Sequence, residues 1–243
     1  MRMLKGKKVV IFDMDGTLID SIGIWNEVDR RLLAKLGEAR VEEIDVQKQR
    51  DGMLRIFADA ENPYLAYCGA LGERYGAAMD AQEIMRLRYG IASELLENEI
   101  DYKPGAVEFL QKMKGMDFRL AIASTTKRGN MEIYRTKNKN IMGKAALDEI
   151  FERIYTQEDA REIKPNPEIH LRLMREMGVS AAECIMFEDS LVGVEAANAA
   201  GIEVVAVYDR FSEADQAEIR ARADYWFEDF AAVLRGMEEC GWN

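Results

Sequence analysis

Short apolar runs, each followed directly by polar residues, constrain the fold of this chain more than any other feature. They are rich in β-branched and aromatic side chains, as buried strands are, and they lie at residues 8–12, 119–123, 184–187 and 203–207. A weaker run at 225–227 is a fifth candidate strand. Helical patterns that begin near proline or end at glycine lie between the runs, at 105–114, 167–177 and 190–200. This alternation predicts an α/β fold: a Rossmann-like parallel sheet with helices on both faces.

Residues 21–100 interrupt the alternation of strands and helices. This stretch shows helical periodicity and no clear strand, with one apolar face around Val28 and Leu32 and another around Ile91 and Leu95. We therefore predict an all-helical domain inserted after the first strand. The core domain would then consist of residues 1–20 and 101–243.

The composition indicates a folded protein and narrows its partners. Of the 243 residues, 48% are hydrophobic, and the net charge is −11. Proteins that bind nucleic acid usually have a basic surface, and this chain is acidic, so no nucleic-acid partner is expected. The apolar run near the N-terminus is too short for a signal peptide or a membrane span. The widely spaced cysteines Cys68, Cys184 and Cys240 indicate reduced thiols. We expect a cytoplasmic protein with no membrane partner, either a monomer or a weak homodimer.

Polar residues at the strand ends are predicted to meet at one edge of the sheet. The first strand leads into Asp13, the second into Ser124 and the third into Glu188. In open α/β sheets, ligands bind outside the carboxyl ends of the strands. The chemistry at this edge must use carboxylates, hydroxyls and lysine, because His170 is the only histidine and paired-histidine mechanisms are excluded within one chain. His170 itself is expected to be structural.

Asp13 and Asp15 stand two residues apart in a predicted tight loop. At about 4 Å and an effective dielectric constant of about 20, two carboxylates repel by about 4 kcal/mol. A divalent cation removes this penalty, and Mg²⁺ usually takes one or two carboxylates together with substrate phosphate and water. Gly16 would let the backbone turn. The pair alone is equally compatible with an Asx-type turn that has no function.

The run from Val9 to Leu18, Val-Val-Ile-Phe-Asp-Met-Asp-Gly-Thr-Leu, resembles the first motif of the haloacid dehalogenase (HAD) superfamily. Later segments match the rest of that pattern in the same order: Ser124, then Lys164-Pro165, then Glu188-Asp189. Residues 187–201 are similar to the corresponding run of the β-phosphoglucomutase-like phosphatases. The resemblance covers residues 1–20 and 101–243 and is weak in the insertion. It implies a HAD-like core with a helical cap domain.

The resemblance also implies a role for each matched residue. Asp13 would be the nucleophile that forms an aspartyl-phosphate, and Asp15 would act first as general acid and then as general base. Ser124 would bind phosphoryl oxygens, helped by backbone N–H groups around Thr125. Lys164 would neutralise charge on the phosphoryl group and on Asp13. The Mg²⁺ ligands would be Asp13, Asp15 (through its backbone carbonyl), Glu188 and Asp189.

Several of these residues also have a purely structural interpretation. Ser124 could cap the helix that follows it. Lys164 could be a solvated loop side chain. The acidic pair Glu188-Asp189 could simply favour the start of a helix through the helix dipole.

By the same resemblance, the inserted domain is a cap that closes over the site, excludes water and selects the leaving group. Trp25 and Arg50 are candidate substrate contacts, although core packing or solvent exposure is the favoured interpretation of each. Related sugar-phosphate mutases carry a histidine in the hinge after the first motif. This chain has none there, which favours a phosphatase.

We therefore predict a Mg²⁺-dependent phosphatase that hydrolyses a small phosphorylated metabolite, a sugar or sugar-alcohol phosphate, through an aspartyl-phosphate. A β-phosphoglucomutase-like isomerase is the alternative within the same chemistry. A non-catalytic binding module on the same fold is the alternative outside it. The binding module is disfavoured because every expected catalytic position carries the required residue type.

Overall fold

The computed structural model describes residues 2–239 of the chain, which divides into two compact units. The first unit contains the chain up to Ile22 and from Ile100 onward, and we call it the core unit. The second unit is Gly23–Glu99, and we call it the helical unit. Each is described separately below.

A parallel sheet forms the centre of the core unit, so the predicted α/β fold class is confirmed. Within residues 2–239 it has six strands in the order β3-β2-β1-β4-β5-β6, and every adjacent pair is parallel. The strands are β1 (Val9–Phe12), β2 (Arg119–Ala123), β3 (Arg153–Tyr155), β4 (Cys184–Glu188), β5 (Glu203–Val207) and β6 (Tyr225–Phe227).

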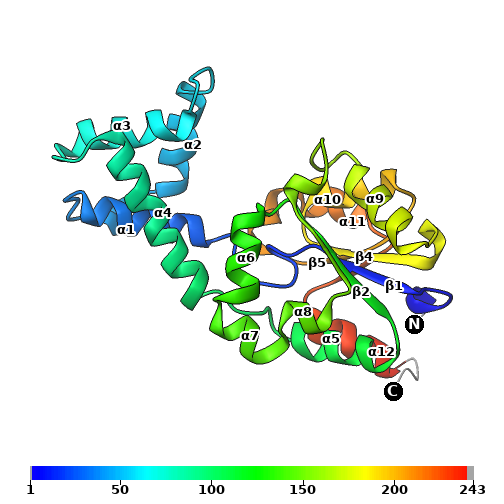
Figure 1. Ribbon diagram of the computed structural model, residues 1–243. Helices are drawn as coiled ribbons and strands as arrows, with labels where there is room; N and C mark the ends of the chain where they lie inside the picture. Colours follow the sequence, from blue (N-terminus) through cyan, green and yellow to red (C-terminus); the bar gives the residue numbers. More distant parts are fainter. Residues whose placement is uncertain (1, 240–243) are drawn as a thin grey trace. The chain divides into compact units, whose positions relative to one another are not determined.

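Helices cover both faces of the sheet (Figure 1). They are α5 (Ala106–Gly115), α6 (Arg128–Thr136), α7 (Lys139–Ala145), α8 (Leu147–Ile150), α9 (Glu168–Met177), α10 (Leu191–Ala199), α11 (Gln216–Arg222) and α12 (Phe230–Glu239). Short 3-10 turns add η1 (Arg2–Leu4), η3 (Gln157–Asp159), η4 (Ala181–Glu183) and η5 (Arg210–Asp215). Helices α9, α10 and α11 lie on one side of the sheet, and α5, α8 and α12 lie on the other.

Alternate side chains of β1 divide the core between these two layers. Val9 and Ile11 belong to the apolar cluster that the sheet shares with α9, α10 and α11. On the opposite face, Phe12 stacks on Phe187 of β4 with 5.2 Å between ring centroids, and both rings meet Phe230 of α12. Both faces of the central strands are therefore buried, which explains why these strands read as continuous apolar runs.

Strand β3 and helices α6, α7, α8 and α11 were not predicted. Strand β3 has three residues, begins with the exposed Arg153 and lies at the edge of the sheet. A segment this short and this polar carries too little periodicity to distinguish it from a loop. The other five strands and the helices α5, α9 and α10 lie within two residues of their predicted positions.

The helical unit consists of helices and one short turn among the described residues, as its periodicity predicts. Its elements are α1 (Ile24–Lys35), η2 (Val41–Glu43), α2 (Val46–Ile56), α3 (Pro63–Tyr75) and α4 (Ala81–Asn98). Val28 and Leu32 of α1 are fully buried, as are Ile84 and Leu95 of α4. Helix α4 begins with a capping box, in which Asp80 and Glu83 satisfy each other's backbone N–H groups.

The two segments that lead out of and back into the core unit pair with each other. Ile19 and Tyr102 form an antiparallel bridge. The Asp20 N–H donates to the Asp101 carbonyl at 3.1 Å, and the Lys103 N–H donates to the Leu18 carbonyl at 2.8 Å. Both segments are thereby anchored to the core unit at one place.

The described part of the chain contains no helix with the length and apolar character needed to span a bilayer. Cys68 and Cys184 are free and buried. Cys240 lies outside the described residues.

Candidate active site

Lys164 is buried between two carboxylates at the carboxyl ends of β1 and β4. Its Nζ donates to Asp13 Oδ1 at 2.7 Å and to Glu188 Oε1 at 2.5 Å. The residue is only 6% exposed, which excludes a solvated loop position. Burial opposes its charged form, but Asp13 and Glu188 outweigh burial and raise the pKa of Lys164 above its ordinary value. Lys164 is therefore an ammonium ion at neutral pH.

Asp13 follows β1 directly and is 7% exposed. Burial raises its pKa to about 7, Lys164 acts in the opposite direction, and Glu188 adds to the increase. His170 of α9 is fully buried, and burial together with Lys164 lowers its pKa to about 3. The imidazole is thus neutral, so Lys164 supplies the positive charge beside Asp13.

Glu188 organises the loop that follows β4. Its Oε1 accepts from Lys164, and its Oε2 accepts from the N–H groups of Asp189 and Ser190 and from the Ser190 hydroxyl, at 2.9, 3.2 and 3.1 Å. A side chain at Gly193 would place its Cβ 1.8 Å from Glu188 Oε1. Gly193 is therefore the residue that leaves room for the Glu188 carboxylate at the start of α10.

Asp189 has one satisfied and one unsatisfied oxygen. Its Oδ1 accepts from the Thr17 hydroxyl at 2.6 Å, whereas its Oδ2 is buried without a hydrogen-bond partner. Gly16 has a φ of +86°, and a Cβ there would lie 2.5 Å from Asp189 Oδ2. Burial, followed by Glu188 and Asp13, raises the pKa of Asp189 well above its ordinary value. The loop after β1 thus approaches Asp189 closely and leaves a carboxylate oxygen that lacks a positive partner.

These carboxylates fit a hard cation such as Mg²⁺. Within residues 2–239, no group of three or more His, Cys, Asp or Glu side chains has the arrangement of a metal site by itself. Mg²⁺ does not need one, because it usually binds one or two carboxylates and completes its coordination with water and substrate phosphate. The unpartnered Asp189 Oδ2, with Asp13 close enough to raise its pKa, supplies that minimal set. Both Glu188 oxygens accept hydrogen bonds, and the predicted role of Glu188 as a Mg²⁺ ligand stays a prediction.

The Asp15 carboxylate is surrounded by hydroxyl groups. Tyr134 of α6 donates to Asp15 Oδ1 at 2.9 Å, Ser21 donates to the same oxygen, and Thr126 donates to Oδ2. Both oxygens of this carboxylate therefore accept hydrogen bonds from hydroxyl groups, and the role of the Asp15 backbone carbonyl as a metal ligand stays a prediction. The structure brings Asp13 and Asp15 to one loop but gives their carboxylates different partners.

Ser124 follows β2 and is 1% exposed. Its Oγ lies 3.0 Å from the Thr126 hydroxyl and accepts the Thr126 N–H at 3.2 Å. Helix α6 begins at Arg128 and has no side-chain cap, so Ser124 does not cap it. Thr125, predicted to help with phosphate, is exposed between the buried Ser124 and Thr126. The predicted site residues Asp13, Ser124 and Glu188 thus lie at the carboxyl ends of β1, β2 and β4, respectively.

Comparison with known proteins identifies the family. The sequence profile of the haloacid dehalogenase-like hydrolases matches residues 10–207, which is most of the chain. The chain belongs to the haloacid dehalogenase-like hydrolases. The resemblance found in its motifs is therefore confirmed.

Three relatives of this haloacid dehalogenase-like hydrolase are between 26% and 29% identical to it in sequence. The phosphorylated carbohydrates phosphatase of Thermotoga maritima is 29% identical over 201 residues, covering 81% of this chain and 82% of the relative. Hexitol phosphatase B of Escherichia coli is 26% identical over 200 residues, with the same coverage of 81% and 82%. A candidate beta-phosphoglucomutase from Thermotoga maritima has a similar crystal structure, with a TM-score of 0.72, 26% identity, and coverage of 96% of this chain and 99% of that one.

Sequence reasoning missed four polar residues of this hydrolase site. Thr17 lies within the first motif, and Ser21 and Thr126 lie close to motif residues, so a search for hydroxyl groups in and near the motifs would have found all three. Tyr134 lies ten residues after Ser124 on a helix that was not predicted, and no local signal connects it to Asp15. Contacts of this kind depend on how helices pack against the sheet and cannot be found from spacing alone.

The two candidate substrate contacts of the helical unit lie at a buried ion cluster. Arg50 and Arg88 each donate to Asp29 at 2.8 Å, and Asp29 and Arg88 are almost completely buried. The Arg88 guanidinium lies over the Trp25 ring at 5.1 Å and the Tyr64 ring at 5.3 Å. Trp25 and Arg50 therefore have clear structural roles within the hydrolase's helical unit, and their contact with substrate stays a prediction.

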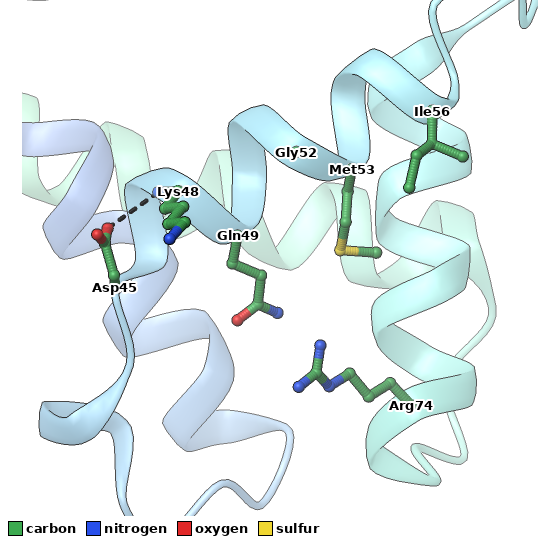
Figure 2. A pocket seen from close by; sticks show the side chains of 7 residues that line it. All are labelled: Asp45, Lys48, Gln49, Gly52, Met53, Ile56 and Arg74. Carbon is green, nitrogen blue, oxygen red and sulfur yellow. Dashed lines mark hydrogen bonds between the residues drawn. The ribbon is translucent and has the colours of Figure 1, made fainter.

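A separate hollow of about 410 Å³ lies between α2 and α3 of the helical unit. Figure 2 shows Arg74 of α3 extending toward α2 and its Gln49. Neither Trp25 nor Arg50 lines it; the lining residues are Asp45, Lys48, Gln49, Gly52, Met53, Ile56 and Arg74. Most of these side chains are exposed, and Asp45 caps α2 by accepting the Lys48 N–H at 2.9 Å. The predicted catalytic residues all belong to the core unit instead.

Proposed function

We propose that the chain is a Mg²⁺-dependent phosphatase that hydrolyses sugar or sugar-alcohol phosphates through an aspartyl-phosphate. The observation that carries this proposal is the buried Asp13–Lys164–Glu188 group, with the unpartnered Asp189 Oδ2 beside it. It presents a carboxylate, an ammonium and a free ligand oxygen at one edge of the sheet. The names of the two phosphatase relatives support the substrate class.

In the first step of the proposed reaction, a carboxylate oxygen of Asp13 attacks the phosphorus atom. The new O–P bond forms as the ester O–P bond breaks, and the leaving oxygen takes a proton from Asp15. In the second step, water attacks the phosphorus and gives a proton to Asp15. The bond between Asp13 and phosphorus breaks, and inorganic phosphate leaves. Asp13 and Asp15 return to their starting states.

The surrounding residues position and neutralise these groups. Lys164 holds Asp13 Oδ1 and balances part of the negative charge that a phosphate brings. Ser124 would contribute its hydroxyl to a phosphoryl oxygen. Mg²⁺, held by Asp13 and Asp189, would supply further charge neutralisation on the phosphoryl oxygens. The helical unit would select the leaving group.

The proposed function is tested by measuring phosphate release from a panel of sugar, sugar-alcohol, nucleotide and small-acid phosphates. We expect rapid release from sugar or sugar-alcohol phosphates with Mg²⁺, loss of activity in EDTA and recovery when Mg²⁺ is restored. Conversion of a sugar phosphate into an isomer, without free phosphate, would instead establish the β-phosphoglucomutase-like alternative. A folded protein that does neither would contradict the proposal and favour a binding module.

Magnesium is expected to stabilise the folded protein more at about pH 8 than at about pH 5.5. The pKa of Asp13 in the folded protein, about 7, lies above its unfolded value of about 3.9. The metal-free folded state therefore binds more protons than the unfolded state between these values, and its unfolding free energy falls as pH rises through them. Protons compete with Mg²⁺ for the same carboxylates. The unfolding temperature, measured with Mg²⁺ and with EDTA at both pH values, checks this.

The matched control for that measurement is Asp189→Asn, which removes a proposed ligand but keeps the shape of the side chain. We expect this variant to lose most of the Mg²⁺-induced increase in unfolding temperature. An increase of equal size at both pH values, or one that Asp189→Asn retains, would contradict the proposed metal site.

A further inference from the structure

The Asp15 carboxylate has one hydrogen-bond donor that comes from a distant helix. Tyr134 of α6 is separated from Asp15 by 119 positions, yet its hydroxyl lies 2.9 Å from Asp15 Oδ1. Tyr134 is 1% exposed and is one of the largest fully buried side chains of the protein. A polar atom in such a place needs a partner, and the partner here is the proposed general acid.

Tyr134 donates this hydrogen bond as a neutral phenol. Burial, followed by Asp15, raises the pKa of Tyr134 well above its ordinary value, so the hydroxyl keeps its proton. Ser21 and Thr126 also donate to Asp15. Their hydroxyls sit on short side chains that rotate about one bond, and the Thr126 hydroxyl also lies 3.0 Å from Ser124 Oγ.

Tyr134 differs from these two donors because its hydroxyl cannot move independently of its ring. The phenolic oxygen lies in the plane of the ring, and the ring is packed inside the core unit on α6. Its position is therefore set by helix packing. Of the three hydroxyls, that of Tyr134 is the one best able to hold Asp15 Oδ1 at a constant place.

We infer that Tyr134 is a positioning residue, which holds Asp15 where it can transfer a proton to the leaving oxygen. This inference rests on the proposed phosphatase function. Its consequence depends on the substrate. A sugar phosphate releases an alkoxide-like oxygen that needs the proton, whereas para-nitrophenyl phosphate releases a stable phenolate that needs it much less. A defect in the position of Asp15 must therefore appear mainly with sugar phosphates.

Tyr134→Phe tests this role, because it removes the hydroxyl and keeps the ring. We expect kcat to fall by about 10-fold or more with a sugar phosphate and by less than about 2-fold with para-nitrophenyl phosphate, with KM nearly unchanged for both. Asp15→Asn should show the same preference with a larger loss. In the Asp15→Asn background, Tyr134→Phe should cause little further loss, because the two changes affect one step.

Tyr155→Phe is the matched control. Tyr155 is also buried in the core unit, and its hydroxyl donates to a carboxylate, that of Glu176, at 2.5 Å. It should leave the ratio of the two kcat values as in the wild type. Equal losses of Tyr134→Phe on both substrates would indicate a merely structural role and overturn the inference, as would no loss on either. A wild-type protein that releases phosphate from neither substrate overturns the proposed function itself, and the positioning role falls with it.

Discussion

Replacing Asp13 with asparagine is expected to abolish phosphate release from every substrate that the wild-type protein hydrolyses. The amide has almost the same shape as the carboxylate, so the loop after β1 can keep its structure, but it is not a nucleophile. We expect kcat to fall by about 10⁴-fold or more, as is usual when a covalent nucleophile is removed. Brief reaction with labelled substrate, followed by acid quenching, should label the wild-type protein and not the Asp13→Asn variant.

The same substitution should leave the protein folded and somewhat more stable without metal. Asp13 is buried together with Glu188 and Asp189, and burial raises its pKa to about 7. An amide at this position carries no charge that must be buried, and Lys164 keeps Glu188 as its ion-pair partner, so no buried charge is left unpaired. The unfolding temperature in EDTA should therefore be equal to or above that of the wild type.

Asp20→Asn is the control for this substitution. Asp20 is in the same loop region but exposed, and it forms a long ion pair of 3.8 Å with Arg210. It should retain activity. Undiminished turnover of Asp13→Asn would disprove the nucleophile assignment. An unfolding temperature of this variant in EDTA below that of the wild type would contradict the expectation that the buried charge of Asp13 destabilises the metal-free protein.

Replacing Lys164 with methionine is expected to affect both activity and stability. The change removes the buried ammonium that Asp13 and Glu188 share and keeps most of the side-chain volume. Removing one partner of a buried ion pair commonly costs about 3–5 kcal/mol, because the remaining charge is left unpaired. We expect a loss of unfolding free energy of this size in EDTA, measured by urea denaturation, together with a loss of phosphate release of about 10²-fold or more.

Lys144→Met provides the comparison for this second substitution. Lys144 also pairs with an aspartate, Asp101, but both side chains are well exposed. Exposed pairs contribute about 1 kcal/mol or less, so this variant should unfold close to the wild type and keep its activity. Similar losses of unfolding free energy in the two lysine variants would contradict the prediction that the buried ion pairs of Lys164 contribute more stability than an exposed pair.

The sequence allowed most of the sheet to be predicted, because the central strands are buried on both faces. Strands β1, β2, β4 and β5 consist mainly of apolar residues, and their shortness and their β-branched or aromatic side chains favour a strand over a buried helix. The edge strand β3 escaped prediction because Arg153, at its start, is exposed. Strand β6, at the other edge, is only half-buried, and its aromatic residues still allowed it to be predicted as a weaker strand.

The candidate site could be predicted as far as its motifs extend. Asp13, Ser124 and Glu188 follow strands of a parallel sheet, so their meeting at one edge follows from topology. The partners of each group could not be predicted in the same way. The hydrogen bond between Tyr134 and Asp15 depends on how segments far apart in the sequence pack together, and so does the hydrogen bond that Glu188 accepts from Lys164. No motif encodes this packing.

The paired segments at Ile19 and Tyr102 have a consequence for how such a protein can change over time. The chain leaves and re-enters the core unit at one place, where the two segments are hydrogen-bonded to each other. Gly23–Glu99 is therefore an insertion that the core unit closes like a single long loop. The entropy of closing a loop grows only with the logarithm of its length. The helical unit can therefore be lengthened, shortened or exchanged with little effect on the folding of the core.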